Sequence, residues 1–396
     1  MTSSILLGVS NNTTTNNALL YFTLKTIPAK RARIHKSRDY HSSMKIGFSL
    51  SPGGLLLPYH LGALAALARH GLVTESTPLA GSSAGAIAVA SHAAHVDSMH
   101  ALEATVRVSQ RLRNQHQDND HHRLFRLGKQ HPLFSIAQGQ LLPALEQELH
   151  ALLPKDAHLQ INERDGLVAL AHRQVFPRNT KVLKTQFDTR QDLMEAICDS
   201  SMFPYFLTNQ PVLIRSSKSR PSHPSATEVS AGRRRRLSLR NPRNKSPHPE
   251  EVQPQTIIGT PRQGVALPRM VVDGFFACSA ERMGCPDFND CTPRNSNDKE
   301  VRVARTVLLS VFPKEMLSLT TTPHQDLIGP SLQPYNLVGQ ATRLVQLATQ
   351  ASDTPRPLYD LYDEGFGDAE QWVRQEQRRQ SIQQQYQIKM ARRQQP

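Results

Sequence analysis

The 396-residue chain has few cysteines, few acidic residues for its number of basic ones, and no long apolar run. Its four cysteines are too few for a disulfide scaffold in a chain of this length. Cys278, Cys285 and Cys291 lack the paired spacing of a zinc site, and we expect them and Cys198 to be free thiols, with no metal bound. No apolar run reaches the roughly 18 residues that a membrane-spanning helix needs.

The charge balance is strongly basic, because 47 lysines and arginines face 33 acidic residues and leave a net charge of +14. Such a chain favours anionic partners, which include nucleic acid, acidic lipid surfaces and the import route of an organelle. Hydrophobic residues make up only 38% of the chain. A packed core must therefore coexist with polar segments that do not contribute to it.

The first 43 residues differ in composition from the rest of the chain. They are rich in Ser, Thr, Asn and basic residues, and Asp39 is their only acid. This composition is typical of a plastid or mitochondrial transit peptide, although a plain disordered tail has the same features. We therefore expect residues 1–43 to direct the protein to one of these organelles, with the cytoplasm or a lipid-droplet or membrane surface as the alternative.

From Met44 onward the pattern alternates between short apolar runs, glycine turns and helical periodicity. A strand at 45–50 is followed by a turn, a helix within 58–71, a strand at 77–80 and a helix at 86–96. This order predicts an α/β fold with a parallel sheet. Further along the chain we expect mainly helix at 97–165, a strand pair at 166–171 and 181–187, helices at 192–203 and 338–352, and strands that end at Asp273 and near 312.

A polar, basic segment interrupts this pattern. Residues 215–249 contain the run Arg233 to Arg236, many Ser and Pro, and only one acid, Glu228. Because such a composition cannot form a core, we place a flexible basic insert at 215–255. The last segment, 376–396, is rich in Gln and Arg and is expected to be a frayed helix or a disordered tail.

The pentapeptide Gly81-Ser82-Ser83-Ala84-Gly85 lies between an expected strand and an expected helix. A Gly-x-Ser-x-Gly motif in this context is typical of a sharp turn that exposes a nucleophilic serine. We assign the nucleophile to Ser83 and expect Ser82 to cap the helix. The alternative is a close-packed helix start, in which small residues only allow two segments to touch.

A serine needs a base, and we expect Asp273 to supply it. It ends the apolar run "RMVV" and precedes a glycine, which places a carboxylate where reactive groups gather at the edge of a parallel sheet. His60 and His92 are not placed to act as the base, although a Ser-His-Asp hydrolase stays an alternative. Asp165-Gly166 precedes its strand and is interpreted as an ordinary turn.

The turn "SPGGLL" after the first strand supplies a third element. The backbone N–H groups of Gly53, Gly54 and Leu55 are expected to form a cradle that stabilises an oxyanion. A dinucleotide-binding turn is excluded because the G-x-G-x-x-G spacing is absent.

This order of motifs resembles the patatin-like phospholipase family. The resemblance is carried by "FSLSPGGLLLPYHLGALAALARHGL", "TPLAGSSAGAIAVA", "DLMEAICDSSMFPYF" and "VVDGFF", and it covers residues 44–375 apart from the insert. It implies a patatin-like three-layer α/β/α sandwich with a mainly parallel central sheet. It also implies a lipid acyl hydrolase with a Ser83–Asp273 dyad, oxyanion donors at Gly53 and Gly54, and no cofactor.

Two departures from the family pattern stand at the site. Ser51 and Pro52 precede only two glycines, and Phe275 stands where the Asp-Gly pair is often followed by another glycine. The alternative function is therefore a non-catalytic lipid- or nucleic-acid-binding protein that keeps the fold. We expect a lipid substrate, contact with anionic membranes and no nucleic acid.

Overall fold

The structure is a computed structural model that describes residues 45–120, 141–208, 210–215, 268–291, 303–313, 326–330, 337–352 and 354–393. The segment 1–43 and the insert, apart from Arg215, lie outside the described residues. None of the described helices combines the length and the apolar character needed to cross a bilayer.

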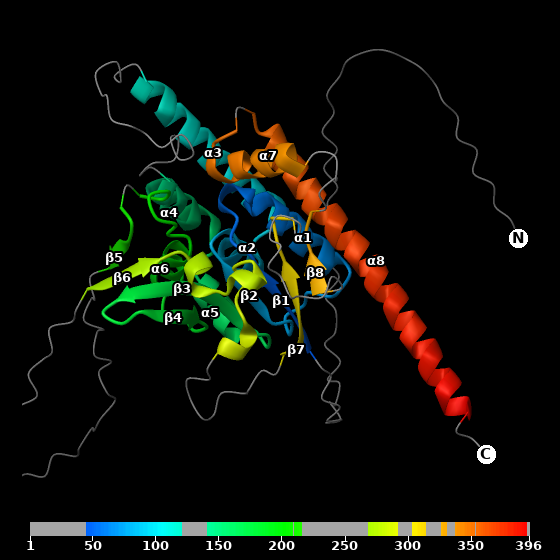
Figure 1. Cartoon of the computed structure of the whole chain (residues 1–396). Helices are drawn as coiled ribbons and strands as arrows, with labels where there is room; N and C mark the ends of the chain where they lie inside the picture. Colours follow the sequence, from blue (N-terminus) through cyan, green and yellow to red (C-terminus); the bar gives the residue numbers. More distant parts are fainter. Residues whose placement is uncertain are drawn as a thin grey trace, which may run out of the picture. The chain divides into compact units, whose positions relative to one another are not determined.

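An eight-stranded sheet forms the centre of the fold, in the order β5-β6-β3-β2-β1-β7-β8 with β4 paired to β3 (Figure 1). Four of its pairings are parallel and three are antiparallel, which confirms the predicted α/β fold with a mainly parallel sheet. The strands are β1 (Lys45–Leu50), β2 (Leu79–Ser82), β3 (Val168–Phe176), β4 (Thr180–Lys184), β5 (Leu213–Arg215), β6 (Arg269–Val272), β7 (Val303–Leu309) and β8 (Leu327–Ile328).

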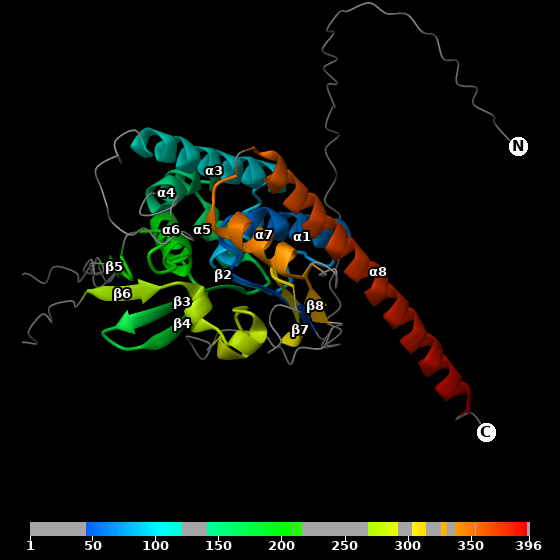
Figure 2. The same ribbon diagram turned by 45° about the horizontal axis from the view of Figure 1, so that its top comes forward.

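Helices gather on one face of this sheet and build the main core with it (Figure 2). On the other face, Phe288 from a short 3-10 turn packs on Ala80 and Ala169 of the strands β2 and β3. The helices are α1 (Leu57–Arg69), α2 (Ala84–Ala93), α3 (Ser98–Asp120), α4 (Leu141–Leu152), α5 (Ala157–Glu163), α6 (Arg190–Ser200), α7 (Leu337–Thr349) and α8 (Arg356–Arg393).

Two strands run toward each other along one side of β3. Because β4 occupies the opposite side of β3, β2 and β6 share this side, with Ser82 paired to Ala171 and Val272 paired to Arg173. β2 is parallel to β3 and β6 is antiparallel to it, so their carboxyl ends meet beside the same short stretch of β3. We expected Asp273 at the edge of a parallel sheet, and that reason was wrong, because β6 runs in the opposite direction.

The longest helix, α8, was not predicted as one element. Its first part crosses α1 so closely that a Cβ on Gly62 would lie 2.0 Å from the carbonyl oxygen of Tyr362, and one on Gly365 would lie 2.1 Å from that of Tyr59. The hydroxyl of Tyr59 donates a hydrogen bond to Asp368 at 2.6 Å across the same crossing. The helix therefore continues into the expected C-terminal tail, as far as Arg393.

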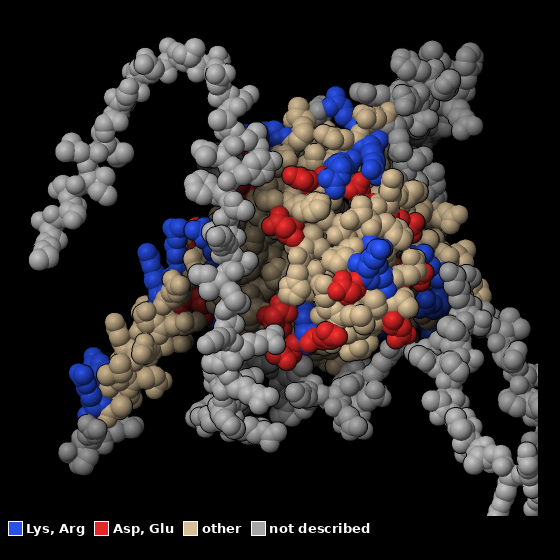
Figure 3. Space-filling view, turned by 180° about the vertical axis from the view of Figure 1, so that it is seen from behind, with Lys and Arg blue, Asp and Glu red and all other residues tan. Residues whose placement is uncertain are grey.

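Toward its C-terminal end, α8 leaves the core and exposes its side chains. Ile382 and Tyr386 are exposed there. Figure 3 shows Lys and Arg but no acidic side chains near this end. The basic character that the sequence indicates is thus present on an ordered helix as well.

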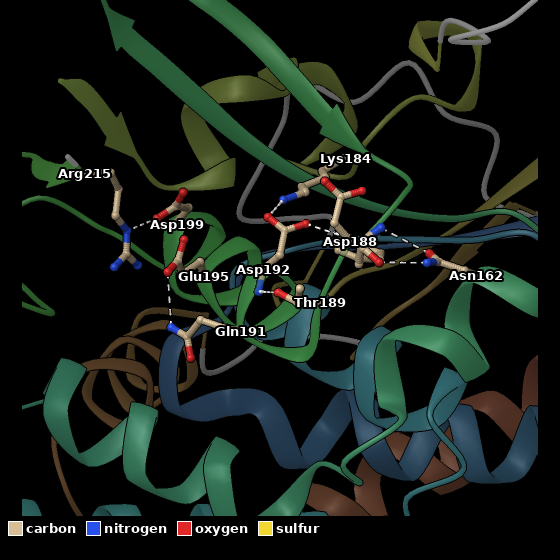
Figure 4. Close-up of polar contacts among 10 residues, drawn as sticks. Asn162, Lys184, Asp188, Thr189, Gln191, Asp192, Glu195, Asp199 and Arg215 are labelled. Atoms are coloured by element: carbon tan, nitrogen blue, oxygen red, sulfur yellow. Dashed lines mark hydrogen bonds and ion pairs between the residues drawn. The ribbon is translucent and has the colours of Figure 1, made fainter. Parts of the chain in front are cut away.

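A network of polar contacts fixes α6, whose C-terminal end leads to the site (Figure 4). Thr189 caps the helix by accepting a hydrogen bond from the N–H of Asp192, and the carboxylate of Asp192 pairs with Lys184. At the other end, Arg215 of β5 forms an ion pair with Asp199 at 2.9 Å. These contacts hold α6 between the strands β4 and β5.

Candidate active site

Ser83 lies at the sharp turn from β2 to α2, with φ 53° and ψ −121°. A non-glycine residue with positive φ is strained, and such strain is typical of a nucleophile turn. The flanking glycines are required by packing, because a Cβ on Gly81 would lie 2.3 Å from the carbonyl oxygen of Gly85, and one on Gly85 would lie 2.7 Å from that of Leu50. The local sequence therefore permits this turn and aims Ser83 out of the sheet.

The two serines next to this turn have different roles. The hydroxyl of Ser82 donates a hydrogen bond to the carbonyl of Gly284 at 2.6 Å, so Ser82 does not cap α2 as we had expected. Ser83 itself occupies the N-cap position. The structure adds Ser200, whose hydroxyl accepts from the N–H of Ser83 at 2.9 Å and donates to the carbonyl of Ala171 at 2.5 Å.

Asp273 follows β6 directly and is 1% exposed. Its Oδ1 accepts a hydrogen bond from the N–H of Phe275 at 2.6 Å, and its own N–H donates to the carbonyl of Met202 at 2.8 Å. Within the described part of the chain, its Oδ2 has no hydrogen-bond partner. Burial raises the pKa of Asp273 to about 7, although the Phe275 amide and the Ser83 hydroxyl act to lower it.

The structure brings Ser83 and Asp273 together at the wall of one cavity. The hydroxyl of Ser83 is close enough to lower the pKa of Asp273, but the pair does not meet the geometry of a hydrogen bond, since Oδ2 stays without a partner. Catalytic hydrogen bonds are often long before substrate binds. The arrangement therefore places a carboxylate of raised pKa close to the serine hydroxyl.

The glycine turn lies on the same cavity. Gly53, Gly54 and Leu55 all line it, and no acceptor for their N–H groups is found among the described residues. Gly54 has φ +56°, and a Cβ there would lie 2.5 Å from the carbonyl oxygen of Ala348 in α7, so only glycine fits. Three backbone donors are thus available to bind an anion beside Ser83.

His60 contacts the backbone that leads into this turn. It is fully buried, and one ring nitrogen, Nε2, lies 2.8 Å from the carbonyl oxygen of Ser51. Burial lowers the pKa of His60 to about 4, so the neutral ring donates this hydrogen bond. No histidine is among the described residues that line the cavity, which gives a Ser-His-Asp arrangement no support.

The cavity has a volume of about 320 Å³ and an almost entirely apolar wall. Ala104 and Val108 of α3, Leu145 and Leu149 of α4, and Val345 of α7 contribute to that wall. One further carboxylate, Glu148, also lines the cavity. It is paired with Arg107 at 3.0 Å and with Arg111 at 2.8 Å, so its charge is balanced. The space suits a hydrocarbon chain better than a polar ligand.

In the described part of the chain, no three His, Cys, Asp or Glu side chains gather in a metal-binding arrangement. Cys198, Cys278, Cys285 and Cys291 all lie in this part of the chain and form no disulfide, which confirms the expectation that they are free thiols. Burial raises the pKa of Cys278 and of Cys291 to about 12. These thiols are therefore protonated and unreactive at neutral pH.

Among known proteins, the family model described as patatin-like phospholipase matches residues 48–223. The matched range contains the glycine turn, Ser83 and Ser200, whereas Asp273 lies beyond its end. The comparison with curated proteins returns no match. Residues 48–223 are thus similar to a patatin-like phospholipase domain, and the α/β fold described above agrees with that similarity.

Proposed function

We propose that the protein hydrolyses carboxylic ester bonds of lipids, with Ser83 as nucleophile and Asp273 as its base. One observation carries the proposal: Ser83, Asp273 and the unpaired amides of Gly53 and Gly54 line a single apolar cavity. The family match supports lipid hydrolysis in general. The residue roles follow from this geometry and from the chemistry of acyl transfer.

In the first step, the ester's acyl chain enters the apolar cavity and Ser83 Oγ attacks its carbonyl carbon. Asp273 accepts the serine proton, and the N–H groups of Gly53 and Gly54 bind the oxyanion that develops. Removal of one such donor typically costs on the order of 3 kcal/mol in the transition state. Asp273 then returns the proton to the leaving alcohol, which is a lysophospholipid or a simpler alcohol.

In the second step, water attacks the acyl-enzyme. Asp273 takes the proton of the water and passes it to Ser83 Oγ as the ester bond breaks, which frees the fatty acid. Ser83 and Asp273 account for every proton transfer in these two steps, so the proposed mechanism uses neither a metal nor a diffusible cofactor. A base with a pKa of about 7 is well matched to this task near neutral pH.

A soluble p-nitrophenyl ester tests the proposal without the complication of a lipid surface. We expect Ser83→Ala and Asp273→Asn each to abolish hydrolysis, and Ser76→Ala, an exposed serine outside the site, to keep it. A fluorophosphonate probe should label the parent protein at Ser83. Failure to label, or full activity of Ser83→Ala, would favour the non-catalytic binding protein. A panel of purified phospholipids, galactolipids and acylglycerols then identifies the substrate.

Two further proposals concern segments that lie, apart from Arg215, outside the described residues. We propose that the insert 215–255 contacts anionic membranes, where each basic residue near the surface contributes about 1 kcal/mol. Deletion of residues 216–249, which keeps Arg215 in β5, should weaken binding to acidic vesicles, and unchanged binding would contradict this role. We also propose that residues 1–43 direct the protein to a plastid or mitochondrion, which a fluorescent fusion of this segment tests.

A further inference from the structure

We propose that an aromatic surface at the mouth of the cavity docks the protein on phospholipid aggregates. This surface, the aromatic rim, consists of the contacting rings of Phe203, Phe275 and Phe276 together with the exposed Tyr205, which follows Phe203 by two residues in the chain. The inference deepens the proposed function, because it names the surface through which a lipid would enter the site. Its partner is the boundary between headgroups and hydrocarbon in a phospholipid layer.

The rim is exposed although it is strongly apolar. Tyr205, Phe275 and Phe276 are 56%, 42% and 37% exposed. The rings of Phe203 and Phe275 each lie against that of Phe276, at centroid distances of 5.6 and 5.4 Å. Exposed apolar patches of this kind mark interaction sites in soluble proteins.

The rim is continuous with the cavity. Phe203 and Phe275 line the cavity together with Asp273, while Phe275 is also open to solvent. An acyl chain that leaves a lipid layer at this point would thus pass from the layer to Ser83 over an unbroken apolar surface. This continuity favours a lipid layer as the occupant over a second copy of the chain, which would close the mouth.

A row of apolar side chains lies on the face of the sheet that Arg173, a hydrogen-bond donor to the carbonyl of Phe276, also occupies. Phe176, Met270 and Ile214 are register partners on β3, β6 and β5, so they point to one face. Phe176 and Ile214 are both exposed. Val272 lies two residues after Met270 on β6 and points to the same face, and so does its register partner Arg173.

Arg173 adds a cation at the edge of the rim. Its guanidinium donates to the carbonyl of Phe276 at 2.8 Å and to the side-chain oxygen of Asn179 at 2.7 Å. Both acceptors are neutral, and no ion pair of Arg173 is found in the described part of the chain. Aromatic rings beside a cation match a phospholipid layer, in which phosphates lie above hydrocarbon.

Tryptophan fluorescence tests this surface without the need for catalysis. The single tryptophan of the chain, Trp372, is 4% exposed. In a Ser83→Ala background, which leaves the lipid intact, Tyr205→Trp places a reporter on the rim. With vesicles of phosphatidylcholine and phosphatidylglycerol, we expect its emission to shift to the blue and to be quenched by brominated lipid. Leu159→Trp, at an exposed position of α5 outside the rim, should show neither change.

Sedimentation with the same vesicles measures the affinity, again in the Ser83→Ala background. We expect Tyr205→Asn combined with Phe276→Ser to weaken binding roughly tenfold, as the loss of partly buried aromatic area predicts. Arg173→Gln should weaken binding to phosphatidylglycerol-containing vesicles about fivefold, whereas Lys155→Gln, an exposed lysine outside the rim, should not.

Three results would overturn the inference. The first is equal quenching at the rim and at the α5 position, which indicates non-specific adsorption. The second is unchanged vesicle binding of the folded double variant. The third is a rim-dependent dimer in sedimentation velocity without vesicle binding, which makes the surface an interface between two copies. Hydrolysis of the soluble ester is measured separately, so failure here is distinct from failure of the proposed function.

Discussion

The hydroxyl of Ser200 accepts a hydrogen bond from the backbone N–H of Ser83 at 2.9 Å, and both residues are buried. The same hydroxyl donates to the carbonyl of Ala171 on β3. The strained turn that carries the proposed nucleophile is thus tied to the central sheet through a residue that lies far from it in the chain.

Ser200→Ala should therefore leave a buried N–H without a partner, which costs about 1–3 kcal/mol. We expect a lower melting temperature and slower fluorophosphonate labelling of Ser83. Ser91→Ala is a matched control, since Ser91 is also buried but its hydroxyl has no partner in the described structure. Equal effects of the two substitutions would show that Ser200 has no special part in holding the turn.

The pH dependence of activity should follow the ionisation of Asp273. A base must be deprotonated to act, and the pKa of Asp273 is about 7. We expect kcat/KM for a soluble ester to rise about tenfold per pH unit below pH 7 and to level off above it. A profile that is flat between pH 5 and pH 8 would contradict the assignment of Asp273 as the base.

Asp273→Asn should stabilise the fold at high pH while it abolishes activity. The pKa of Asp273 is raised from 3.8 to about 7 on folding, so the folded state binds the proton more tightly than the unfolded state. The stability that this proton provides is lost as the pH rises toward 7, up to a bound of about 4 kcal/mol. Asparagine keeps the acceptor for the Phe275 amide and has no charge to bury.

The measurement is the free energy of unfolding of the parent protein and of Asp273→Asn at pH 5 and at pH 8. The advantage of the variant should grow between these two values. An advantage that stays constant or shrinks would show that the carboxylate is not buried as described.

Gly54→Ala should impair both the fold and the site. Its positive φ disfavours alanine by about 1–2 kcal/mol, and the new methyl group would meet the carbonyl of Ala348. Gly71→Ala is a close control, because Gly71 has φ +70° but open space around it. We expect Gly71→Ala to lower stability only, whereas Gly54→Ala should also lower kcat at least tenfold, since it displaces an oxyanion donor.

His60→Gln distinguishes the Ser–Asp dyad from a Ser-His-Asp hydrolase. The neutral His60 ring only donates to the carbonyl of Ser51, and a glutamine amide can do the same. We expect activity to fall less than tenfold, far less than in Asp273→Asn. A complete loss of activity in a folded His60→Gln protein would instead support a histidine as the catalytic base.

The local features of the site could be predicted from the sequence, and the non-local ones could not. Gly81, Ser83 and Gly85 define a turn within five residues, and that turn forms as expected. The position of Asp273 at a strand end was also predictable. The direction of β6 was not, because it depends on which strand β6 pairs with.

Ser200 and α8 were missed for similar reasons. The importance of Ser200 comes from contacts with two distant segments, and the sequence placed it only within the helix expected at 192–203. The core-facing side of α8 includes Gly365 and Ala369, which have little hydrophobic signal but allow α1 to approach. Close helix contacts of this kind leave a weak periodic pattern.

The pairing of Arg215 with Arg269 has an architectural consequence. The chain leaves the sheet at the end of β5 and returns to it at the start of β6, and these two positions are neighbours in the sheet. The hydrogen bonds between the strands therefore fix the position of Asp273, whatever the length of the polypeptide that connects β5 to β6. Insertions and deletions in that loop can thus accumulate over evolution, altering what the protein touches while the reaction geometry is preserved. Even a nick there would leave nucleophile and base on one hydrogen-bonded framework.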